Sequence, residues 1–203
     1  MKHPSNIEAV GKLNPDYMGF ILYKGSPRYV SAEEVRKLAA DIPSAIRKVG
    51  VLVNEPINNA LEIANSGIFD IIQLHGTESV DYCQKISSCI GIFKTFSISK
   101  TLPLNLGDYQ EFCEMFLFDT SGKNYGGTGE MFDHKILSDY KLDKEFILSG
   151  GISVVDLSYY KSINYNCIAG LDLNSRFELK PGLKDVELLK KFINNIRANE
   201  VND

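Results

Sequence analysis

The sequence has no long hydrophobic run and no excess of positive charge. No stretch approaches the roughly 18 apolar residues that a transmembrane helix needs, and the N-terminal segment shows no apolar region of the signal-peptide type. The net charge is −4, and the basic residues are scattered along the chain. Nucleic acid and membrane surfaces are therefore not expected partners.

Cysteine is also scarce, and its spacing excludes two classes of protein. The chain has four cysteines, with neither CxxC spacing nor the density of a disulfide scaffold. We therefore expect reduced thiols and a cytoplasmic location. No metal site is expected, since the acidic residues between positions 108 and 114 are typical of a solvated helix face. The cysteines are Cys83, Cys89, Cys113 and Cys167.

Short apolar runs alternate with amphipathic segments along almost the whole chain. These runs are continuous rather than alternating, as expected for parallel strands that are covered on both faces. Seven strands are predicted: Tyr17–Leu22, Lys48–Val53, Asp70–His75, Gly91–Phe96, Met115–Phe118, Glu145–Ser149 and Cys167–Leu171.

Eight helices are predicted in the amphipathic segments. One of them carries a capping box, with Ser31 as the N-cap and Glu34 three residues later. No linker or shift in composition divides the chain, so residues 1–203 are expected to form one domain. The helices are Ser5–Leu13, Ser31–Ile42, Ile57–Asn65, Val80–Ser87, Asp108–Cys113, His134–Tyr140, Val154–Lys161 and Asp185–Asn195.

This alternation predicts an α/β fold of the (β/α)8, or TIM, barrel type. In such barrels each strand precedes its helix, whereas this chain opens on a helix. Seven strands are thus expected against eight helices, and the strand that is missing is the first.

Polar residues follow the predicted strands, at the end of the barrel where chemistry takes place. Asp119 ends one strand and precedes a loop with three glycines, Gly126, Gly127 and Gly129. Gly150 and Gly151 follow the next strand, and Asn174 and Ser175 follow the last one. Consecutive backbone N–H groups after the last two strands commonly bind phosphate. The predicted ligand is therefore anionic and rich in hydroxyl groups.

Seven blocks in order make the sequence resemble the phosphoribosylanthranilate isomerase family. The blocks are GFILYKGSPRYVS, KVGVLVNEP, IIQLHGTES, FLFDT followed by GGTG and FD, ILSGGIS, GLDLNS and KPGLKD. The resemblance runs from about Gly19 to Asp185 and also includes the first helix. It implies a (β/α)8 barrel that catalyses an Amadori rearrangement in tryptophan biosynthesis, without a metal or cofactor. The implied partner is a small phosphosugar, and the chain is expected to be a monomer or a homodimer.

The resemblance also implies roles for individual residues. Asp119 is the implied general acid, and Arg28 is expected to pair with the anthranilate carboxylate. His75 and Asp172 would line the pocket. The phosphate would be held by Gly150, Gly151, Asn174 and Ser175. The segment DLNSRFE departs from the family's usual DVSSG-type loop, which loosens the assignment of the side chains there.

The family's general base is a cysteine at the end of the first strand, in a K-(I/V)-C-G pattern that this sequence does not contain. None of the four cysteines is expected to replace it. Three explanations stay open: a start assigned to an internal Met, a truncated and inactive isomerase, or a phosphosugar-binding barrel without catalysis. The 203-residue form is expected to be barely active, and either marginal in stability or prone to pair its sheet edges with another chain.

Each candidate residue also has a simpler interpretation. Asp119 taken alone is as typical of a capping residue at a strand end as of a catalytic acid. Arg28 taken alone is more typical of a surface residue tied to a neighbouring Glu. His75 is more often a residue satisfied by hydrogen bonds than a base, and Asp172 is as suited to holding loop backbone as to touching substrate. A rival enzyme, indole-glycerol-phosphate synthase, would need more lysines at strand ends than Lys24 and Lys94.

Overall fold

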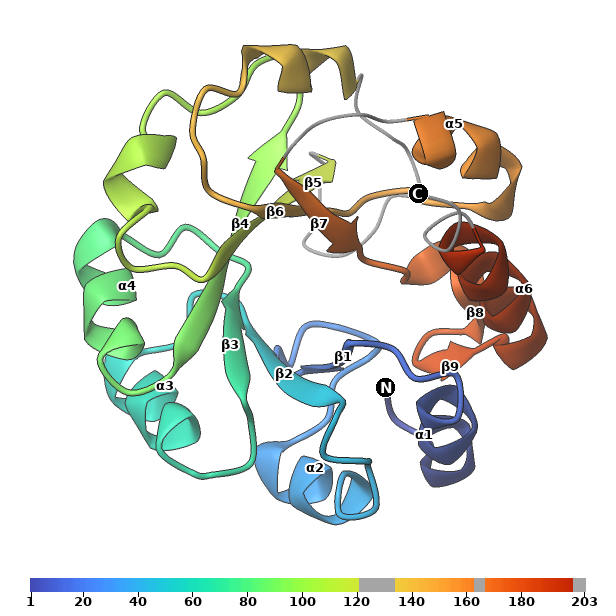
Figure 1. Ribbon diagram of the computed structural model, residues 1–203. Coiled ribbons are helices and arrows are strands. Elements are labelled where there is room, and N and C mark those ends of the chain that lie inside the picture. Colours follow the sequence, from blue (N-terminus) through green and yellow to red (C-terminus); the bar gives the residue numbers. More distant parts are fainter. Residues whose placement is uncertain (121–133, 163–166, 199–203) are drawn as a thin grey trace.

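The computed structural model describes residues 1–120, 134–162 and 167–198. Its main element is a parallel sheet of seven strands, in which each strand pairs with the next along the chain. The sheet curls, and helices lie around its outside (Figure 1). The strands are β1 (Tyr17–Ile21), β2 (Arg47–Leu52), β3 (Ile71–Leu74), β4 (Gly91–Ile98), β5 (Met115–Thr120), β6 (Phe146–Leu148) and β7 (Ile168–Leu171).

The described residues form six α-helices, four short 3₁₀-helices and one hairpin. The hairpin, β8 (Glu178–Lys180) with β9 (Leu183–Lys184), is antiparallel and was not expected from the sequence. The α-helices are α1 (Pro4–Gly11), α2 (Ala32–Leu38), α3 (Ile57–Ala64), α4 (Val80–Ser87), α5 (Leu157–Ser162) and α6 (Val186–Arg197). The 3₁₀-helices are η1 (Leu106–Tyr109), η2 (His134–Asp139), η3 (Val154–Asp156) and η4 (Ser175–Phe177).

The seven parallel strands agree with the sequence prediction, but the number of α-helices does not. The segments predicted as helices at Asp108–Cys113 and His134–Tyr140 contain only η1 and η2, which have four and six residues. Over so few residues the hydrogen bonds gained barely offset the cost of nucleation, so the local packing decides between the α and the 3₁₀ form. The tighter 3₁₀ turn is common in such connectors.

Side-chain caps fix where several helices begin. The predicted capping box is present: the Ser31 hydroxyl accepts from the backbone N–H of Glu34, and the Glu34 carboxylate accepts from that of Ser31. Ser79 caps α4 in the same way through Tyr82 N, at 3.2 Å. These caps set where each loop ends, and hence which residues remain in the loops above the sheet.

The two faces of the sheet bury different residues. A small inner cluster comprises Val49, Ile71, Phe93, Leu117 and Ile147, whereas a larger outer cluster packs the sheet against the helices. Side chains alternate along a strand. Since Ile71 of β3 belongs to the inner cluster, residues 73 and 75 also point inward. The same alternation directs Asp119 inward from Leu117. The sequence thus brings polar groups into the interior at the carboxyl ends of the strands.

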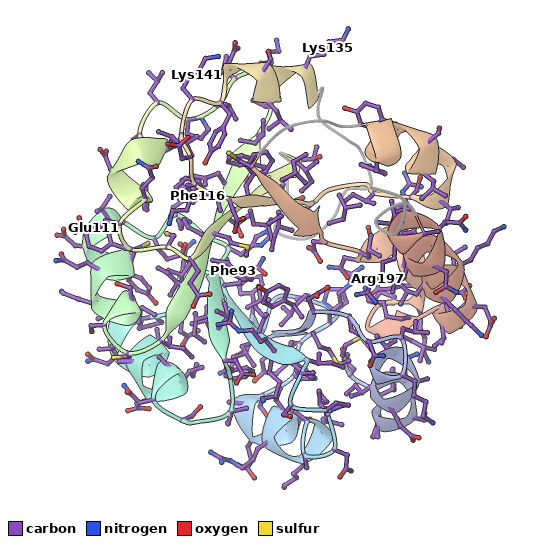
Figure 2. All side chains as sticks on the ribbon, viewed as in Figure 1. Phe93, Glu111, Phe116, Lys135, Lys141 and Arg197 are labelled. Carbon is purple, nitrogen blue, oxygen red and sulfur yellow. The ribbon has the colours of Figure 1, made fainter. Side chains whose placement is uncertain are left out.

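Figure 2 shows the same division in the side chains. Phe93 and Phe116 lie at the sheet and are 2% and 0% exposed. Glu111, Lys135 and Lys141 lie on the outside of the molecule and are exposed. The acidic face expected between positions 108 and 114 is solvated, since Asp108 and Glu114 are exposed as well.

The sheet is curled but not closed among the described residues, because β1 and β7 are its two end strands. The hairpin β8–β9, α1 and α6 lie beside the gap between them (Figure 1). Met1 is buried in this region, and its terminal nitrogen donates to Gly19 O of β1 at 2.8 Å. No helix of the described chain is long and apolar enough to cross a membrane.

Candidate active site

A cavity of about 420 Å³ occupies the interior of the curled sheet. The inner cluster forms part of its wall, and loops that follow the strands form much of the rest. All eight residues that the sequence singled out line this one cavity: Arg28, His75, Asp119, Gly150, Gly151, Asp172, Asn174 and Ser175. The glycine loop at 126–129 and the FD pair at 132–133 lie outside the described residues.

Asp119 and His75 are in contact with each other at the wall of the cavity. Asp119 is next to last in β5, and its Oδ2 lies 3.3 Å from His75 Nε2. Their side chains are only 12% and 16% exposed, respectively. The other carboxylate oxygen of Asp119 accepts from the backbone N–H of Thr120 at 2.9 Å. A negative charge on Asp119 is thus met by a backbone donor on one side and an imidazole on the other.

Gln73, an inward residue of β3, orients the ring of His75, which directly follows that strand. Its Nε2 lies 2.9 Å from His75 Nδ1 and 3.3 Å from Thr95 Oγ1. Because an amide nitrogen only donates, this contact makes Nδ1 the acceptor of the ring. The hydrogen of the neutral imidazole is then on Nε2, where it points to Asp119.

Asp172 lies beside this pair, and a side chain holds its carboxylate. Ser149 Oγ donates to its Oδ2 at 3.0 Å. Desolvation raises the pKa of the Asp172 carboxyl above its usual value, against the opposing effects of the Lys184 ammonium and the Ser149 hydroxyl.

Arg28 has a partner within the protein. Its Nε lies 3.0 and 3.1 Å from the two carboxylate oxygens of Glu178, and its Nη2 lies 2.7 Å from Oε2. The side chains of Arg28 and Glu178 are 13% and 4% exposed. Arg28 is thus paired with a Glu, but it is not the surface residue that the simpler interpretation expected, because the pair is mostly buried and the Glu is 150 residues away.

Two charged residues of the site were not found from the sequence, Glu178 and Lys184. Lys184 Nζ donates to Leu173 O at 3.1 Å and to Asn174 Oδ1 at 2.9 Å, and it lies 3.4 Å from Glu178 Oε1. Burial lowers the pKa of Lys184, while the charge of Glu178 opposes that shift. The only signal in the sequence was their place in the DLNSRFE and KPGLKD segments.

The predicted phosphate loops come together at one side of the cavity. Gly150 and Gly151 both have positive φ, 84° and 70°. A Cβ atom on Gly150 would lie 2.6 Å from Thr120 N and 2.7 Å from Asp119 Oδ1, so no larger residue fits beside the Asp119 carboxylate. Asn174 precedes η4, which begins at Ser175, and its side chain turns to Lys184.

No cysteine lines the cavity in the described part of the chain. Cys83 is buried in α4, and Cys113 is buried just before β5. Cys89 is exposed, and Cys167 immediately precedes β7. Across residues 1–120, 134–162 and 167–198, no group of three or more His, Cys, Asp or Glu side chains is arranged to hold a metal ion.

Similarity to known proteins identifies the family of this chain. Residues 1–195 match the family model described as N-(5'phosphoribosyl)anthranilate (PRA) isomerase. An N-(5'-phosphoribosyl)anthranilate isomerase of Phocaeicola vulgatus is 38% identical over 199 residues, which are 97% of this chain and 95% of the relative.

Solved structures agree with this match. The phosphoribosyl anthranilate isomerase of Thermotoga maritima superimposes with a TM-score of 0.82 at 30% identity, covering 98% of this chain and 96% of the other. A phosphoribosyl anthranilate isomerase in complex with reduced 1-(o-carboxyphenylamino)-1-deoxyribulose 5-phosphate has a TM-score of 0.79 at 27% identity, covering 98% and 95%. The chain therefore belongs to the N-(5'-phosphoribosyl)anthranilate isomerase family.

Proposed function

We propose that this protein isomerises N-(5-phosphoribosyl)anthranilate to 1-(2-carboxyphenylamino)-1-deoxyribulose 5-phosphate, a step of tryptophan biosynthesis. Family membership supports the reaction, and one observation carries its chemistry. Asp119 stands in the cavity with donors at both carboxylate oxygens, Thr120 N and His75 Nε2. A carboxyl group in that position donates a proton and is stabilised as the carboxylate that remains.

Asp119 would open the ribose ring of the substrate. Its proton passes to the ring oxygen, the bond from that oxygen to C1 breaks, and the nitrogen lone pair forms the C1–N double bond. A base then removes the proton from C2, so that the C1–C2 double bond forms and the C1–N bond becomes single again. The resulting enol becomes the ketone when its hydroxyl loses a proton and C1 gains one. Asp119 is the proposed general acid, and His75 and Asp172 line the pocket around the reacting carbons.

The two charged ends of the substrate fit the two sides of the cavity. Arg28 is the proposed partner of the anthranilate carboxylate, and its guanidinium is already held in place by Glu178. Gly150, Gly151, Asn174 and Ser175 are the proposed phosphate site. The Lys184 ammonium, which donates to Asn174 O at 3.1 Å, adds positive charge behind that loop.

The proposed domain is residues 1–203 as one unit of the (β/α)8-barrel type. The outer core cluster supports this, since it joins Ile7 and Val10 of α1 to Leu189 and Phe192 of α6. A cytoplasmic location, and a monomer or homodimer that takes a small phosphosugar, stay predictions.

A second candidate is a phosphosugar-binding barrel without catalysis. It is favoured by the absence of cysteine from the cavity lining of the described residues, because the family resemblance implies a thiol base. Loss of a general base typically lowers a rate by about 10²–10⁴. We therefore expect residues 1–203 to turn over substrate slowly while still binding the product.

The fluorescence loss of phosphoribosylanthranilate separates these candidates. We expect the protein to bind the reduced product analogue and to accelerate the fluorescence loss above the uncatalysed rate. Asp119→Asn should abolish the acceleration and retain binding, whereas Asp108→Asn, the same change at an exposed carboxylate, should leave it unchanged. Binding with no acceleration would favour the non-catalytic barrel. Equal rates for parent and Asp119→Asn would overturn the assignment of the acid.

A further inference from the structure

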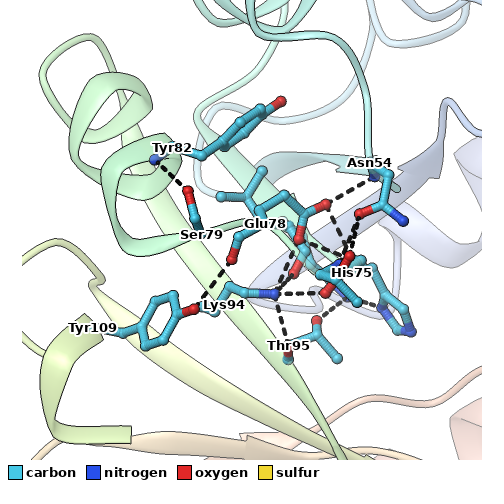
Figure 3. A network of polar contacts seen from close by, with 12 residues as sticks. Asn54, His75, Glu78, Ser79, Tyr82, Lys94, Thr95 and Tyr109 are labelled. Carbon is cyan, nitrogen blue, oxygen red and sulfur yellow. Dashed lines mark hydrogen bonds and ion pairs between the residues drawn. The ribbon is translucent and has the colours of Figure 1, made fainter. Parts of the chain in front are cut away.

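A buried ion pair lies behind the sheet, on the face opposite the cavity. Lys94 of β4 and Glu78 of the loop before α4 are 3.0 Å apart at Nζ and Oε2, with side chains 3% and 1% exposed (Figure 3). Lys94 pairs in register with Leu74 and faces the outer layer, where its Nζ lies 5.5 Å from the centre of the Phe96 ring. The pair has no place in the substrate chemistry described above.

The contacts of this pair converge on the backbone around His75. Lys94 Nζ donates to Gly76 O at 2.8 Å and to Leu74 O at 3.4 Å, which are the carbonyls on either side of His75. The Glu78 carboxylate accepts from Gly76 N at 3.0 and 3.1 Å. His75 thus lies in a short stretch of backbone that both members of the pair hold.

The same pair joins a second loop above the sheet. Glu78 Oε1 accepts from Asn54 N at 2.9 Å, and Asn54 Oδ1 accepts from Thr77 N at 2.8 Å. Tyr109 OH donates to Glu78 O at 3.2 Å from the far side (Figure 3). Glu78 is therefore fixed from three directions before it acts on the residues around His75.

Strand β4 holds His75 from both of its faces. Thr95 lies on the inner face of the sheet and contacts Gln73, the residue that orients the imidazole. Lys94, the residue before it, faces the outer layer and holds the backbone of the same segment. The ring of His75 and the backbone beside it are thus held by different side chains, and the position of the ring depends on both.

Stability alone does not account for such a pair. Desolvation of two buried charges largely cancels their attraction, and well-packed apolar residues often serve as well or better. We propose that Glu78 and Lys94 are positioning residues that hold His75 at its 3.3 Å contact with Asp119. The effect on catalysis rests on the proposed isomerase function, whereas the effect on His75 does not.

A double variant tests this proposal without leaving one charge buried alone. Lys94→Met with Glu78→Gln removes both charges and keeps an oxygen acceptor for the loop N–H groups. The matched control is Ile92→Ala, which truncates a fully buried residue on the same face of the same strand, toward its amino end. Both variants are compared with the parent by ring NMR of labelled histidine, which is feasible because the chain has three histidines.

We expect the double variant to broaden or shift the His75 ring signals, identified with His75→Asn, and to lose the ring's contact with Gln73. Ile92→Ala should lower stability and leave those signals in place. In turnover, the double variant should lower kcat by about 10²-fold, the loss expected from a small misplacement, with the affinity for the reduced product analogue retained.

Unchanged His75 signals in the folded double variant would overturn the proposal. Equal changes of the His75 signals in the double variant and in Ile92→Ala would overturn it too, because the pair would then act only through stability. A parent that binds no product analogue and turns over no substrate would count against the proposed function instead, and the NMR comparison would still decide the positioning of His75.

Discussion

At the scale of single residues, the backbone at Gly150 sets how closely the loop after β6 approaches Asp119. Its φ of 84° is a conformation that side-chain-bearing residues rarely adopt, and the added Cβ of Gly150→Ala would meet Thr120 N at 2.6 Å. We expect Gly150→Ala to lower the free energy of unfolding by about 1–3 kcal/mol. It should also reduce affinity for the reduced product analogue, because the loop moves away from its place beside Asp119. Urea unfolding and a binding titration measure the two effects.

Gly107→Ala is the matched control for that change. Gly107 is exposed, and a Cβ atom there meets nothing within 4 Å. Its unfolding midpoint and its affinity should equal those of the parent. A Gly150→Ala protein that behaves like this control would show that the loop tolerates a side chain at Gly150.

The site illustrates what single residues reveal before a structure is known. Asp119 and His75 were found because each follows a run of apolar residues, and alternation along the strand then turns both inward. Glu178 and Lys184 were missed, since their place in two quoted segments does not by itself give them a role in the site. Glu178 meets Arg28 from 150 residues away, and such a pairing arises only when the ends of the chain come together.

At the scale of elements, the hairpin β8–β9 connects the end of the chain to the loop after β1. The connection is the ion pair of Glu178 with Arg28, to which Lys184 contributes. Burial alone raises the pKa of Glu178, but the hydrogen bonds from Arg28 and the charge of Lys184 outweigh it, so that the pKa lies below its usual 4.5. The carboxylate therefore stabilises the fold in its charged form.

Glu178→Gln should accordingly be costly at neutral pH. It leaves two buried cations without their partner, a change that typically costs about 3–5 kcal/mol. A lowered folded-state pKa gives stability that is present above the unfolded pKa and lost as pH falls through the folded value. The difference between parent and variant should hence shrink as pH falls below about 4.5. Urea unfolding as a function of pH measures this.

The control for this variant is Glu8→Gln, which removes a carboxylate that pairs with Lys12 on the surface of α1. Its stability should follow that of the parent at each pH. A loss of stability in Glu178→Gln that stays constant below pH 4.5 would contradict the role given to the charge of Glu178.

The elements themselves were predictable to the degree that local pattern determines them. The strands and the capped helix at Ser31 follow from apolar runs and from a capping box. The segments at 108–113 and 134–140 carry the same amphipathic signal but form 3₁₀-helices, which a pattern of apolar and polar residues does not distinguish from an α-helix over so few positions. The hairpin β8–β9 has only three and two residues in its strands, so it offers no periodicity to detect.

At the scale of the whole molecule, the two ends of the chain are joined by one buried amide. Asn6 of α1 is 7% exposed; its Nδ2 donates to Lys184 O at 2.9 Å, and its Oδ1 accepts from Lys184 N at 2.8 Å. The side chain thus acts as an additional strand partner for β9 across 178 positions. If one domain includes both ends, the loss of this side chain should therefore lower the stability of the whole domain.

Asn6→Ala leaves two buried backbone groups without partners. Each unpaired group typically lowers the free energy of unfolding by about 1–3 kcal/mol. If residues 1–203 form one domain, tyrosine fluorescence and far-UV circular dichroism should report a single unfolding transition, displaced equally in both signals. Asn59→Ala, which removes an amide exposed on α3, should leave the midpoint in place. Separate transitions in Asn6→Ala, with the sheet unfolding at the parent's midpoint, would contradict the single domain. They would show instead that α1 and the hairpin form a unit that detaches from the curled sheet.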